Sequence, residues 1–507
     1  MPISDLFSKA GITFWDVAHE TNGGLIADGY TRATGKMSMV VAQNGPGITG
    51  LVTPIKTAYW NHTPLLVVTP QAANKTMGQG GFQEVEQMNL FKDMVCYQEE
   101  VRDPSRMAEV LNRVIEKAFR GSAPAQINVP RDYWTQVIDI DLPPIVRFER
   151  QGGGEEAVNK AASILSKAKF PVILSGAGVV IGNAIEECKM LAERLDAPVC
   201  NGYQHNDSFP GSHPLAVGPL GYNGSKAAMQ LISKADVVLA LGTRLNPFST
   251  LPGYGIDYWP KNATIIQVDM NPDRIGLTKK VTVGICGDCK MVAKQISDKL
   301  SKDAGNDGRE ERKNLIHKTK SAWLQTLTGL DHEEDDPGTV WNKEARERDK
   351  DRMSPRQAWR AIQEAIPTGA IISSDIGNNC AIGNAYPTFE EGRKYLAPGL
   401  FGPCGYGFPS ILGAKIGCPE TPVIGFAGDG AFGISMNEMS SCARKEWPAI
   451  TMVIFRNYQW GAEKRNSILW FDDNFVGTEL DPELSYAKVA NACGCLLYTS
   501  PSPRDRG

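Results

Sequence analysis

Short β-rich apolar runs alternate with helical stretches along most of the chain, and this alternation limits its fold more than any other feature. The runs at 38–43, 64–70 and 124–130 form one such series, with helical spacing between them. Strands separated by helices predict βαβ units, in which helices cover both faces of a mainly parallel sheet. We therefore predict an α/β fold built from open, mainly parallel sheets flanked by helices.

The same alternation appears in two further blocks, so the 507 residues are predicted to form three consecutive α/β domains. A polar, glycine-rich break at 150–156 separates the first block from the second. A stretch dense in charged residues separates the second block from the third, and we interpret it as an exposed connector. The predicted boundaries are 1–150, 156–300 for a central Rossmann-like domain, 301–353 for the connector, 354–495 for the third domain and 496–507 for an aperiodic tail, interpreted as a sequencing or cloning scar.

Charge and hydropathy argue against two classes of partner. The chain has 53 Lys and Arg against 57 Asp and Glu, so no overall basic field is available to hold a nucleic-acid backbone. Its apolar runs are strand-length, far shorter than the roughly 20 residues that cross a bilayer. The eleven scattered cysteines are unlike a disulfide framework, and no signal-peptide pattern follows Met1. We therefore expect reduced thiols and a cytoplasmic location.

The most informative motif is Gly428-Asp429-Gly430, which ends an apolar strand-like run. Asn457 ends the next such run, 28 residues after Asp429. Two adjacent parallel strands would bring both oxygens to one edge of a sheet, and carboxylate and amide oxygens suit Mg²⁺ that also binds phosphate oxygens. Gly428, Gly430 and Ala431 are small, so the backbone N–H groups at the following helix start can approach a diphosphate. Gly-Asp-Gly alone is also ordinary turn chemistry.

A second motif, His19-Glu20-Thr21-Asn22, opens a helical stretch near the N-terminus. Thr21 or Asn22 can cap the first turn, which places Glu20 at the helix start. From this motif alone, a surface glutamate that stabilises the helix dipole is the favoured interpretation, and only the other motifs of the chain reverse it.

Taken together, the motifs of this chain resemble those of the thiamine diphosphate enzymes of the acetolactate synthase superfamily. The resemblance rests on Glu20 before the stretch 23–35, Asn44-Gly45-Pro46-Gly47, Phe82-Gln83-Glu84, and Gly428-Asp429-Gly430 with Asn457. These motifs follow the family order across residues 10 to about 490. The resemblance implies that the first domain binds the cofactor's pyrimidine and that the third binds its diphosphate. It also implies a homodimer or homotetramer.

The resemblance further implies a role for each matching residue. Glu20 matches the glutamate that hydrogen-bonds the aminopyrimidine N1′ and activates the cofactor. The side chains of Asp429 and Asn457, with the Gln459 carbonyl, match the Mg²⁺ ligands. Further cofactor contacts are implied for Asn44, Gly377, Asn378, Asn379, Gly428, Gly430 and Ala431, and for Cys404, which falls where relatives place a bulky residue under the thiazolium.

A closer resemblance, to the sulfoacetaldehyde acetyltransferase family, lies in the stretches 14–22, 395–410 and 455–467. It implies conversion of sulfoacetaldehyde and phosphate to acetyl phosphate and sulfite. Both substrates are anionic, so hydrogen-bond donors are required, and our candidates are His19, Asn44, Gln83, Arg456, Lys464 and Arg465. An acetolactate synthase-like carboligase acting on pyruvate and a catalytically silent structural or regulatory homologue are the alternatives. The retention of Glu20, Asp429 and Asn457 argues against the silent homologue.

Two further features are interpreted with the family in view. Gly176-Ala177-Gly178 follows a strand-like run, but Ile181 stands where a dinucleotide motif needs its third glycine. Some relatives hold FAD or ADP in this domain, and we expect none here and a structural role for the loop. Compared with the family pattern, the chain lacks a first strand–helix unit and a closing one, so we interpret it as truncated at both ends.

Overall fold

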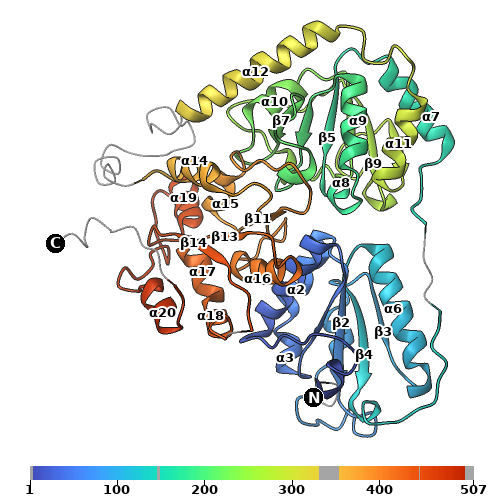
Figure 1. Cartoon of the computed structure of the whole chain (residues 1–507), viewed down its shortest axis with the longest axis vertical. Coiled ribbons are helices and arrows are strands. Elements are labelled where there is room, and N and C mark those ends of the chain that lie inside the picture. The colour runs from blue at the N-terminus through green and yellow to red at the C-terminus, as the bar shows by residue number, and fades with distance from the viewer. Residues whose placement is uncertain (1–3, 145–148, 330–352, 445, 497–507) are drawn as a thin grey trace. The chain divides into compact units, whose positions relative to one another are not determined.

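Three parallel β-sheets, each flanked by helices, organise the computed structural model, which describes residues 4–144, 149–329, 353–444 and 446–496 (Figure 1). The predicted α/β fold is thereby confirmed. By compactness the chain divides into two units. Described residues of the first unit lie within Met1–Val146, Ile371–Gly377 and Leu396–Gly507, and those of the second within Arg147–Ala370 and Asn378–Tyr395. The first unit therefore contains both the first and the third sheet.

The first sheet has strand order β1-β2-β4-β3, with every strand pair parallel. Its strands are β1 (Ser38–Val41), β2 (Leu65–Gln71), β3 (Tyr97–Glu100) and β4 (Ala125–Pro130). All residues of β2 and β4 are buried, as expected for the central strands of a sheet covered on both faces. The accompanying helices are α1 (Ser4–Phe7), α2 (Glu20–Thr34), α3 (Pro46–Thr49), α4 (Val52–Asn61), α5 (Gln87–Leu90), α6 (Met107–Gly121), η1 (Pro104–Arg106) and η2 (Arg131–Tyr133).

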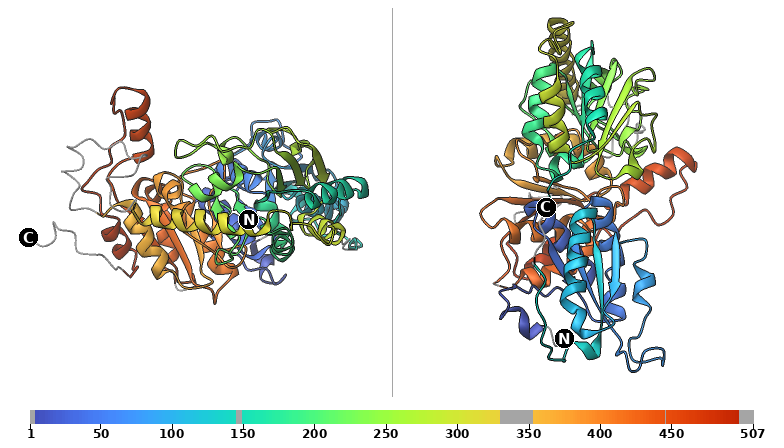
Figure 2. Two further views of the ribbon diagram at one scale, coloured as in Figure 1. Left: turned by 90° about the horizontal axis from the view of Figure 1, so that it is seen from above. Right: turned by 90° about the vertical axis from the view of Figure 1, so that its right-hand side faces the viewer.

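The third sheet has strand order β12-β11-β13-β14. Its strands are β11 (Ile371–Ser374), β12 (Tyr395–Leu396), β13 (Val423–Gly428) and β14 (Thr451–Phe455). The helices are α16 (Gly407–Gly417), α17 (Asp429–Ser435), η7 (Met436–Glu438), α18 (Met439–Cys442), α19 (Gly461–Trp470) and α20 (Tyr486–Ala492). Helix α19 has no buried residue and extends outward from this sheet (Figure 2).

Helices α2 and α16 pack backbone against backbone and join the first and third sheets of the unit (Figure 1). A Cβ atom at Gly29 would overlap the carbonyl group of Ser410, and one at Gly413 would overlap the carbonyl oxygen of Ile26. Glycine is therefore required at both positions for this approach. The crossing fixes the start of α2 relative to the loop that precedes α16.

The second unit carries the central sheet, with order β10-β9-β8-β5-β6-β7 and only parallel pairs. Its strands are β5 (Pro171–Ser175), β6 (Val199–Asn201), β7 (Ala216–Pro219), β8 (Val237–Leu241), β9 (Thr264–Asp269) and β10 (Val283–Cys286). The helices are α7 (Glu155–Ser166), α8 (Ala177–Ile181), α9 (Ile185–Leu195), α10 (Lys226–Ile232), α11 (Cys289–Lys299), α12 (Arg309–Gly329), α14 (Pro355–Ala365), α15 (Asn378–Gly383), η3 (Asn206–Ser208), η4 (Phe248–Thr250) and η5 (Pro272–Arg274).

The stretch expected to be an exposed connector begins instead with a continuous helix, α12 (Figure 2). The guanidinium of Arg312, 2% exposed, donates to the carbonyl oxygens of Leu195 and Asp196, and the Trp323 ring lies edge-on to Tyr254. These buried contacts, which the charged composition concealed, anchor the helix on the central domain. The remainder, 330–352, lies outside the described residues, as does nearly all of the predicted tail.

The Gly176-Ala177-Gly178 loop has a packing role in the central domain. Cβ atoms at Gly176 and Gly178 would lie 2.5 Å from the Gly242 carbonyl oxygen and 2.7 Å from the Gly242 Cα. The loop after β5 therefore needs glycine in order to pack against the loop after β8.

Candidate active site

Glu20 is the first residue of α2, and its carboxyl group lies against the loop that follows β1. A Cβ atom at Gly47 would lie 3.1 Å from Glu20 Oε1, and one at Gly50 would lie 3.1 Å from the Glu20 Cβ. The two glycines therefore leave room for this side chain. His19 caps the helix by accepting the Thr21 N–H at Nδ1 over 3.1 Å, and the Thr21 hydroxyl donates to the Gly50 carbonyl over 2.7 Å.

Asn44 and Gln83, predicted from separate motifs, meet on this side of the first sheet. The buried Asn44 amide donates to the Gln83 carbonyl over 3.0 Å, and Gln43 Nε2 donates to Asn44 Oδ1 over 2.8 Å. Gln83 has a φ of 62°, the left-handed region that few side chains adopt without support. The Asn44 amide therefore holds an unusual backbone conformation in place.

Asp429 directly follows β13 and is the first residue of α17, and its buried carboxylate faces the end of β14. Asp429 Oδ1 accepts the Gly430 N–H over 3.0 Å, and Oδ2 accepts the Tyr458 N–H over 2.7 Å. Burial raises the pKa of Asp429, and the three backbone N–H donors of Tyr458, Gly430 and Asn457 oppose that increase. A cation at this carboxylate would offset the same desolvation.

The Asn457 side chain lies next to the other two predicted metal ligands, Asp429 and Gln459, beyond the ends of β13 and β14. One terminal atom of the Asn457 amide lies 2.9 Å from the Gln459 carbonyl oxygen and 3.2 Å from Asp429 Oδ1. When this atom is the amide nitrogen, it donates to both oxygens. When the amide is turned, its oxygen takes this place beside the Gln459 carbonyl oxygen and Asp429 Oδ1, at separations that two neighbouring Mg²⁺ ligands have when the metal–oxygen bonds are about 2.0–2.1 Å. The chemistry and spacing of Asp429, Asn457 and Gln459 therefore fit a Mg²⁺ ion.

Space for a diphosphate lies beside the same strand ends. Cβ atoms at Gly428 and Gly377 would meet nothing within 4 Å, and these glycines follow the adjacent parallel strands β13 and β11. Ala431 lies in the first turn of α17. Gly430 differs from the prediction in one respect, because its N–H is bonded to Asp429 and a Cβ there would lie 2.7 Å from the Trp460 ring.

Asn378 and Asn379 begin α15, which belongs to the second compact unit. The Asn379 carbonyl accepts the Trp359 indole N–H over 3.2 Å, which joins α15 to α14. Their contact with the cofactor stays a prediction.

Cys404 lies half-buried in the loop before α16, and burial raises the pKa of its thiol to about 11. The loop is fixed by a residue that sequence analysis missed, Asp375, at the end of β11. Its buried carboxylate accepts the N–H groups of Gly405 over 3.1 Å and Gly407 over 2.8 Å. Burial raises the pKa of Asp375 to about 6. The position at the carboxyl end of a predicted strand was a usable signal.

A second buried carboxylate holds the same loop from helix α2. Asp28 Oδ2 accepts the Tyr406 hydroxyl over 2.6 Å, and Arg32 Nη1 donates to that hydroxyl oxygen over 2.7 Å. Asp28 is fully buried. The position of Cys404 therefore depends on both sheets of the first unit.

The predicted substrate cations Arg456 and Lys464 make contacts within the third domain. Arg456 donates to the carbonyl oxygens of Pro482 and Leu484, and its guanidinium lies 4.4 Å from the centre of the Tyr458 ring. Lys464 pairs with Glu479. Arg465 lies on α19, beside Lys464. Binding a substrate anion would require Arg456 and Lys464 to exchange these partners, so the substrate roles stay predictions.

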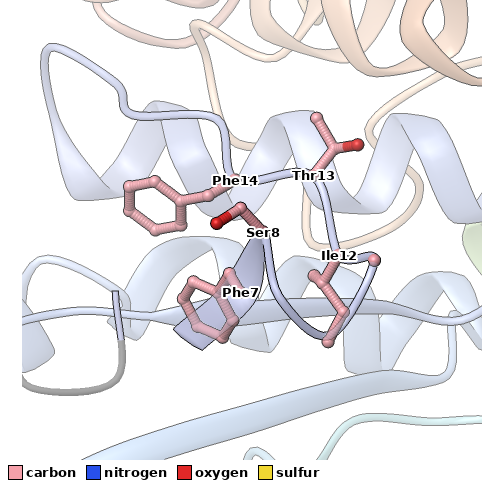
Figure 3. Close-up of a pocket in the computed structure, with 6 residues that line it drawn as sticks. Phe7, Ser8, Ile12, Thr13 and Phe14 are labelled. Atoms are coloured by element: carbon pink, nitrogen blue, oxygen red, sulfur yellow. The ribbon is translucent and has the colours of Figure 1, made fainter. Parts of the chain in front are cut away.

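A separate pocket near the N-terminus is lined by none of the predicted site residues, although its segment ends shortly before His19 and Glu20. It is lined by Phe7, Ser8, Gly11, Ile12, Thr13 and Phe14, and the rings of Phe7 and Phe14 stack at 5.4 Å (Figure 3). Among residues 4–144, 149–329, 353–444 and 446–496, no group of three His, Cys, Asp or Glu side chains is arranged to hold a metal ion. The candidate Mg²⁺ site instead combines a carboxylate with amide and carbonyl oxygens. Within the described part of the chain, no helix is long and apolar enough to span a membrane.

Comparison with known proteins identifies all three domains. Residues 1–90, 158–296 and 375–505 match the N-terminal, central and C-terminal domains of the thiamine pyrophosphate enzymes, the outer two described as TPP-binding. The chain is 76% identical over 99% of its length to a "Probable sulfoacetaldehyde acetyltransferase" of Rhizobium meliloti, covering 85% of that protein. It is 77% identical over 97% of its length to a "Sulfoacetaldehyde acetyltransferase" of Roseovarius nubinhibens, covering 82% of that protein.

More distant relatives carry another name. A "Probable acetolactate synthase large subunit" of Methanococcus aeolicus is 30% identical over the whole chain and is covered over 84% of its length. The fold, the geometry at the strand ends and these comparisons agree. The chain belongs to the thiamine pyrophosphate enzyme family, in the group of the sulfoacetaldehyde acetyltransferases.

Proposed function

We propose that this protein is a thiamine diphosphate-dependent acyltransferase that converts sulfoacetaldehyde and phosphate to acetyl phosphate and sulfite. The observation that carries the proposal is the 69–77% identity to three sulfoacetaldehyde acetyltransferases, against 30% to an acetolactate synthase. We therefore assign the activity of the more similar relatives, and a carboligase acting on pyruvate is not favoured.

The proposal assigns the metal ion and the diphosphate of the cofactor to named residues. Mg²⁺ would bind the Asp429 carboxylate, the Asn457 amide oxygen and the Gln459 carbonyl oxygen, whose proximity supports this assignment. The open space at Gly428 and Gly377 would receive the diphosphate. When bound, thiamine diphosphate supplies an electron sink for the carbon that was the aldehyde carbonyl.

Glu20 is assigned the proton chemistry of the site. As the first residue of α2 beside Gly47 and Gly50, its carboxyl group is held at the helix start rather than in a flexible loop. Its carboxyl oxygen would hold the proton shared with the pyrimidine nitrogen. Asn44 keeps the Gln83 backbone in place, which orients the Gln83 side chain as a neutral donor for the substrate.

The overall reaction balances without an external oxidant. The carbon–sulfur bond breaks, and sulfite leaves with the electron pair. The aldehyde carbon loses its hydrogen as a proton and becomes the acyl carbon, while the neighbouring carbon gains a proton. A phosphate oxygen then takes the acyl group. Two anions must be held, so the exchange of Arg456 or Lys464 from their present partners is part of the proposal.

Assembly and location complete the proposal. A homodimer or homotetramer would bring the Glu20 of one subunit to the Asp429 of another. A cytoplasmic location rests on the scattered cysteine pattern of the sequence, which suits a reducing compartment.

A test offers the purified chain, with thiamine diphosphate and Mg²⁺, two alternative substrates. With sulfoacetaldehyde and phosphate we expect sulfite, detected with a thiol-reactive disulfide dye. With pyruvate alone we expect little acetolactate. Acetolactate formation without sulfite release from sulfoacetaldehyde would overturn the proposed substrate.

A further inference from the structure

A buried carboxylate outside the predicted site, Glu438, contacts the helix turn that carries Glu20. It is the last residue of η7, directly after α17 and therefore one short element beyond Asp429. Glu438 has 0% exposure. Its Oε1 accepts the Ala18 N–H over 3.0 Å and the Ser441 hydroxyl over 2.6 Å, while its Oε2 accepts the Asn22 side-chain amide over 2.9 Å.

The two long-range bonds bracket Glu20. Ala18 lies two residues before it and Asn22 two residues after it, so a single carboxylate holds both sides of the turn. Asn22 is 3% exposed, and its amide also donates to Asn437 Oδ1 over 3.0 Å. The backbone of Glu20 cannot shift without breaking buried hydrogen bonds, and each such break leaves a polar group unpaired.

The chemistry of the contact requires a carboxylate. The Ala18 N–H, the Asn22 amide and the Ser441 hydroxyl are all donors, so both oxygens of residue 438 must accept. A glutamine would present an N–H₂ group to one of these donors. Within the described part of the chain no salt bridge to Glu438 is found, and the two oxygens of its side chain accept the three hydrogen bonds named above.

Other contacts join the segment before α2 to the segment after η7, but they do not involve Glu20 or the turn around it. Arg444 donates to the Asp16 carboxylate over 2.7 Å and to the Asp16 carbonyl over 2.8 Å, at the surface of the protein. The rings of Trp15 and Trp447 lie edge-on at 5.1 Å. These contacts would keep the two segments packed together after Glu438 is changed. A variant at residue 438 therefore tests the position of the Glu20 turn and not the packing of the segments.

We propose that Glu438 is a positioning residue, which fixes the carboxyl group of Glu20 for proton transfer by hydrogen-bonding both sides of its turn. The inference deepens the proposed function and rests on the role assigned to Glu20. Glu438 itself touches neither substrate nor cofactor. Its effect must therefore appear as a loss of order at residues 18–22 and as slower proton transfer, with substrate affinity preserved.

The first measurement needs no cofactor. In the full chain, Glu438→Gln should speed hydrogen–deuterium exchange of the 16–26 segment by about tenfold, the scale of one mismatched buried hydrogen bond. Asn22→Ser, which removes the bonds of the Asn22 amide to Glu438 Oε2 and Asn437 Oδ1 but keeps the Ala18 bond to Oε1, should give a smaller change in the same segment. Glu420→Gln, an exposed change in the same domain, should leave the segment unaltered. Unchanged exchange in both Glu438→Gln and Asn22→Ser would overturn the proposal.

The second measurement follows proton transfer. With thiamine diphosphate and Mg²⁺ bound, exchange of the cofactor C2 proton should slow by about tenfold in Glu438→Gln, and the KM for sulfoacetaldehyde should stay within about twofold. Ser208→Ala, which removes a buried hydroxyl in the central domain, controls for general destabilisation and should leave C2 exchange unchanged.

A compensating pair separates positioning from simple damage. In Glu438→Gln combined with Asn22→Asp, the new amide donates to the new carboxylate, and the Asn437 amide can turn to donate as well. C2 exchange and the 16–26 protection should both recover. If they do not recover in a folded double variant, the specific pairing is wrong. If Glu20→Gln also leaves C2 exchange unchanged, the proposed function fails; if only Glu438→Gln leaves it unchanged, the positioning role fails.

Discussion

At the residue scale, the candidate site divides between a metal-binding group and a proton-transfer group on different elements. Asp429 begins α17 directly after β13, and its Oδ1 lies 3.2 Å from a terminal atom of the Asn457 amide, whereas Glu20 begins α2. This separation means that binding of the cofactor and its activation can be removed independently.

Asp429→Ala should weaken Mg²⁺-dependent thiamine diphosphate binding by about 100-fold or more. Even the loss of a residue that only hydrogen-bonds a metal ligand lowers metal affinity by about 10–100-fold. Glu20→Gln should bind the cofactor almost normally but exchange its C2 proton slowly. Calorimetry of cofactor binding and NMR of C2 exchange measure the two effects. Asp481→Ala, an exposed change in the same domain, serves as the control. Normal C2 exchange in Glu20→Gln would remove Glu20 from the mechanism.

Asp375 predicts a pH dependence of stability. Burial raises its pKa from 3.8 to about 6, so the folded protein keeps a proton on this group at pH values where the unfolded chain has lost it. Its contribution to stability is full below pH 3.8 and is lost as the pH rises through about 6. Between about pH 5 and pH 8 the group lowers the free energy of unfolding by about 1.4 kcal/mol.

In Asp375→Asn that part of the pH dependence should disappear. Denaturant midpoints at the two pH values measure it, with Asp481→Asn as the exposed control. A pH dependence equal to that of the unchanged protein would contradict the raised pKa. The absolute stability of Asp375→Asn should also fall, because one amide oxygen replaces two carboxylate acceptors of the loop that carries Cys404.

Residues at strand ends were predictable from the sequence, whereas their supports were not. Glu20 and Asp429 follow from a helix-start pattern and a strand-end pattern that span only a few positions. Glu438 was missed because its partner Asn22 is 416 positions away in the chain. Asp375 was missed although it ends a predicted strand, because its role depends on the amides of Gly405 and Gly407 thirty positions later.

At the element scale, the crossing of α2 and α16 connects the two sheets of the first unit. The sequence predicted the helix that follows His19 but neither α16 nor the contact between them, because the need for glycine at Gly29 and Gly413 arises only when the two helices are brought together. The same helices carry the Asp28–Tyr406 hydrogen bond, so the crossing also holds the Cys404 loop. The sequence therefore predicted the strands and helices better than their tertiary pairing.

Gly413→Ala should destabilise the first unit by about 1–3 kcal/mol, the usual range for overpacking, because its methyl group would overlap the Ile26 carbonyl. Gly154→Ala is a matched control, since a Cβ there meets nothing within 4 Å. Thermal unfolding of the two variants makes the comparison. Equal midpoints would show that the helices separate readily to accept the methyl group.

At the scale of the whole molecule, the α/β prediction was correct because the strand–helix alternation runs through all three domain matches. In 309–329 the sequence indicated only an apolar helical patch around Trp323 and not the full length of α12, since the charged residues there outnumber the few that the helix buries, such as Arg312 and Trp323. The proposed sharing of each active site between two subunits is tested by mixing variant chains.

A mixture of Glu20→Gln and Asp429→Ala chains should regain activity if each site takes these residues from different subunits. One of the two sites in a mixed dimer would then be intact, so a random mixture should reach about a quarter of the normal activity. Each variant alone should stay inactive. Mixed dimers that form, as verified by mass spectrometry, but stay inactive would contradict the shared site.

The most direct test of the central claim is the stoichiometry of products from sulfoacetaldehyde. With thiamine diphosphate, Mg²⁺ and phosphate present, sulfite and acetyl phosphate should be measured in the same reaction, the latter as its hydroxamate. We expect equal amounts of the two products, no acetyl phosphate when phosphate is omitted, and neither product from Glu20→Gln. Sulfite accompanied by acetate instead of acetyl phosphate, or no sulfite from the cofactor-loaded protein, would contradict the assignment.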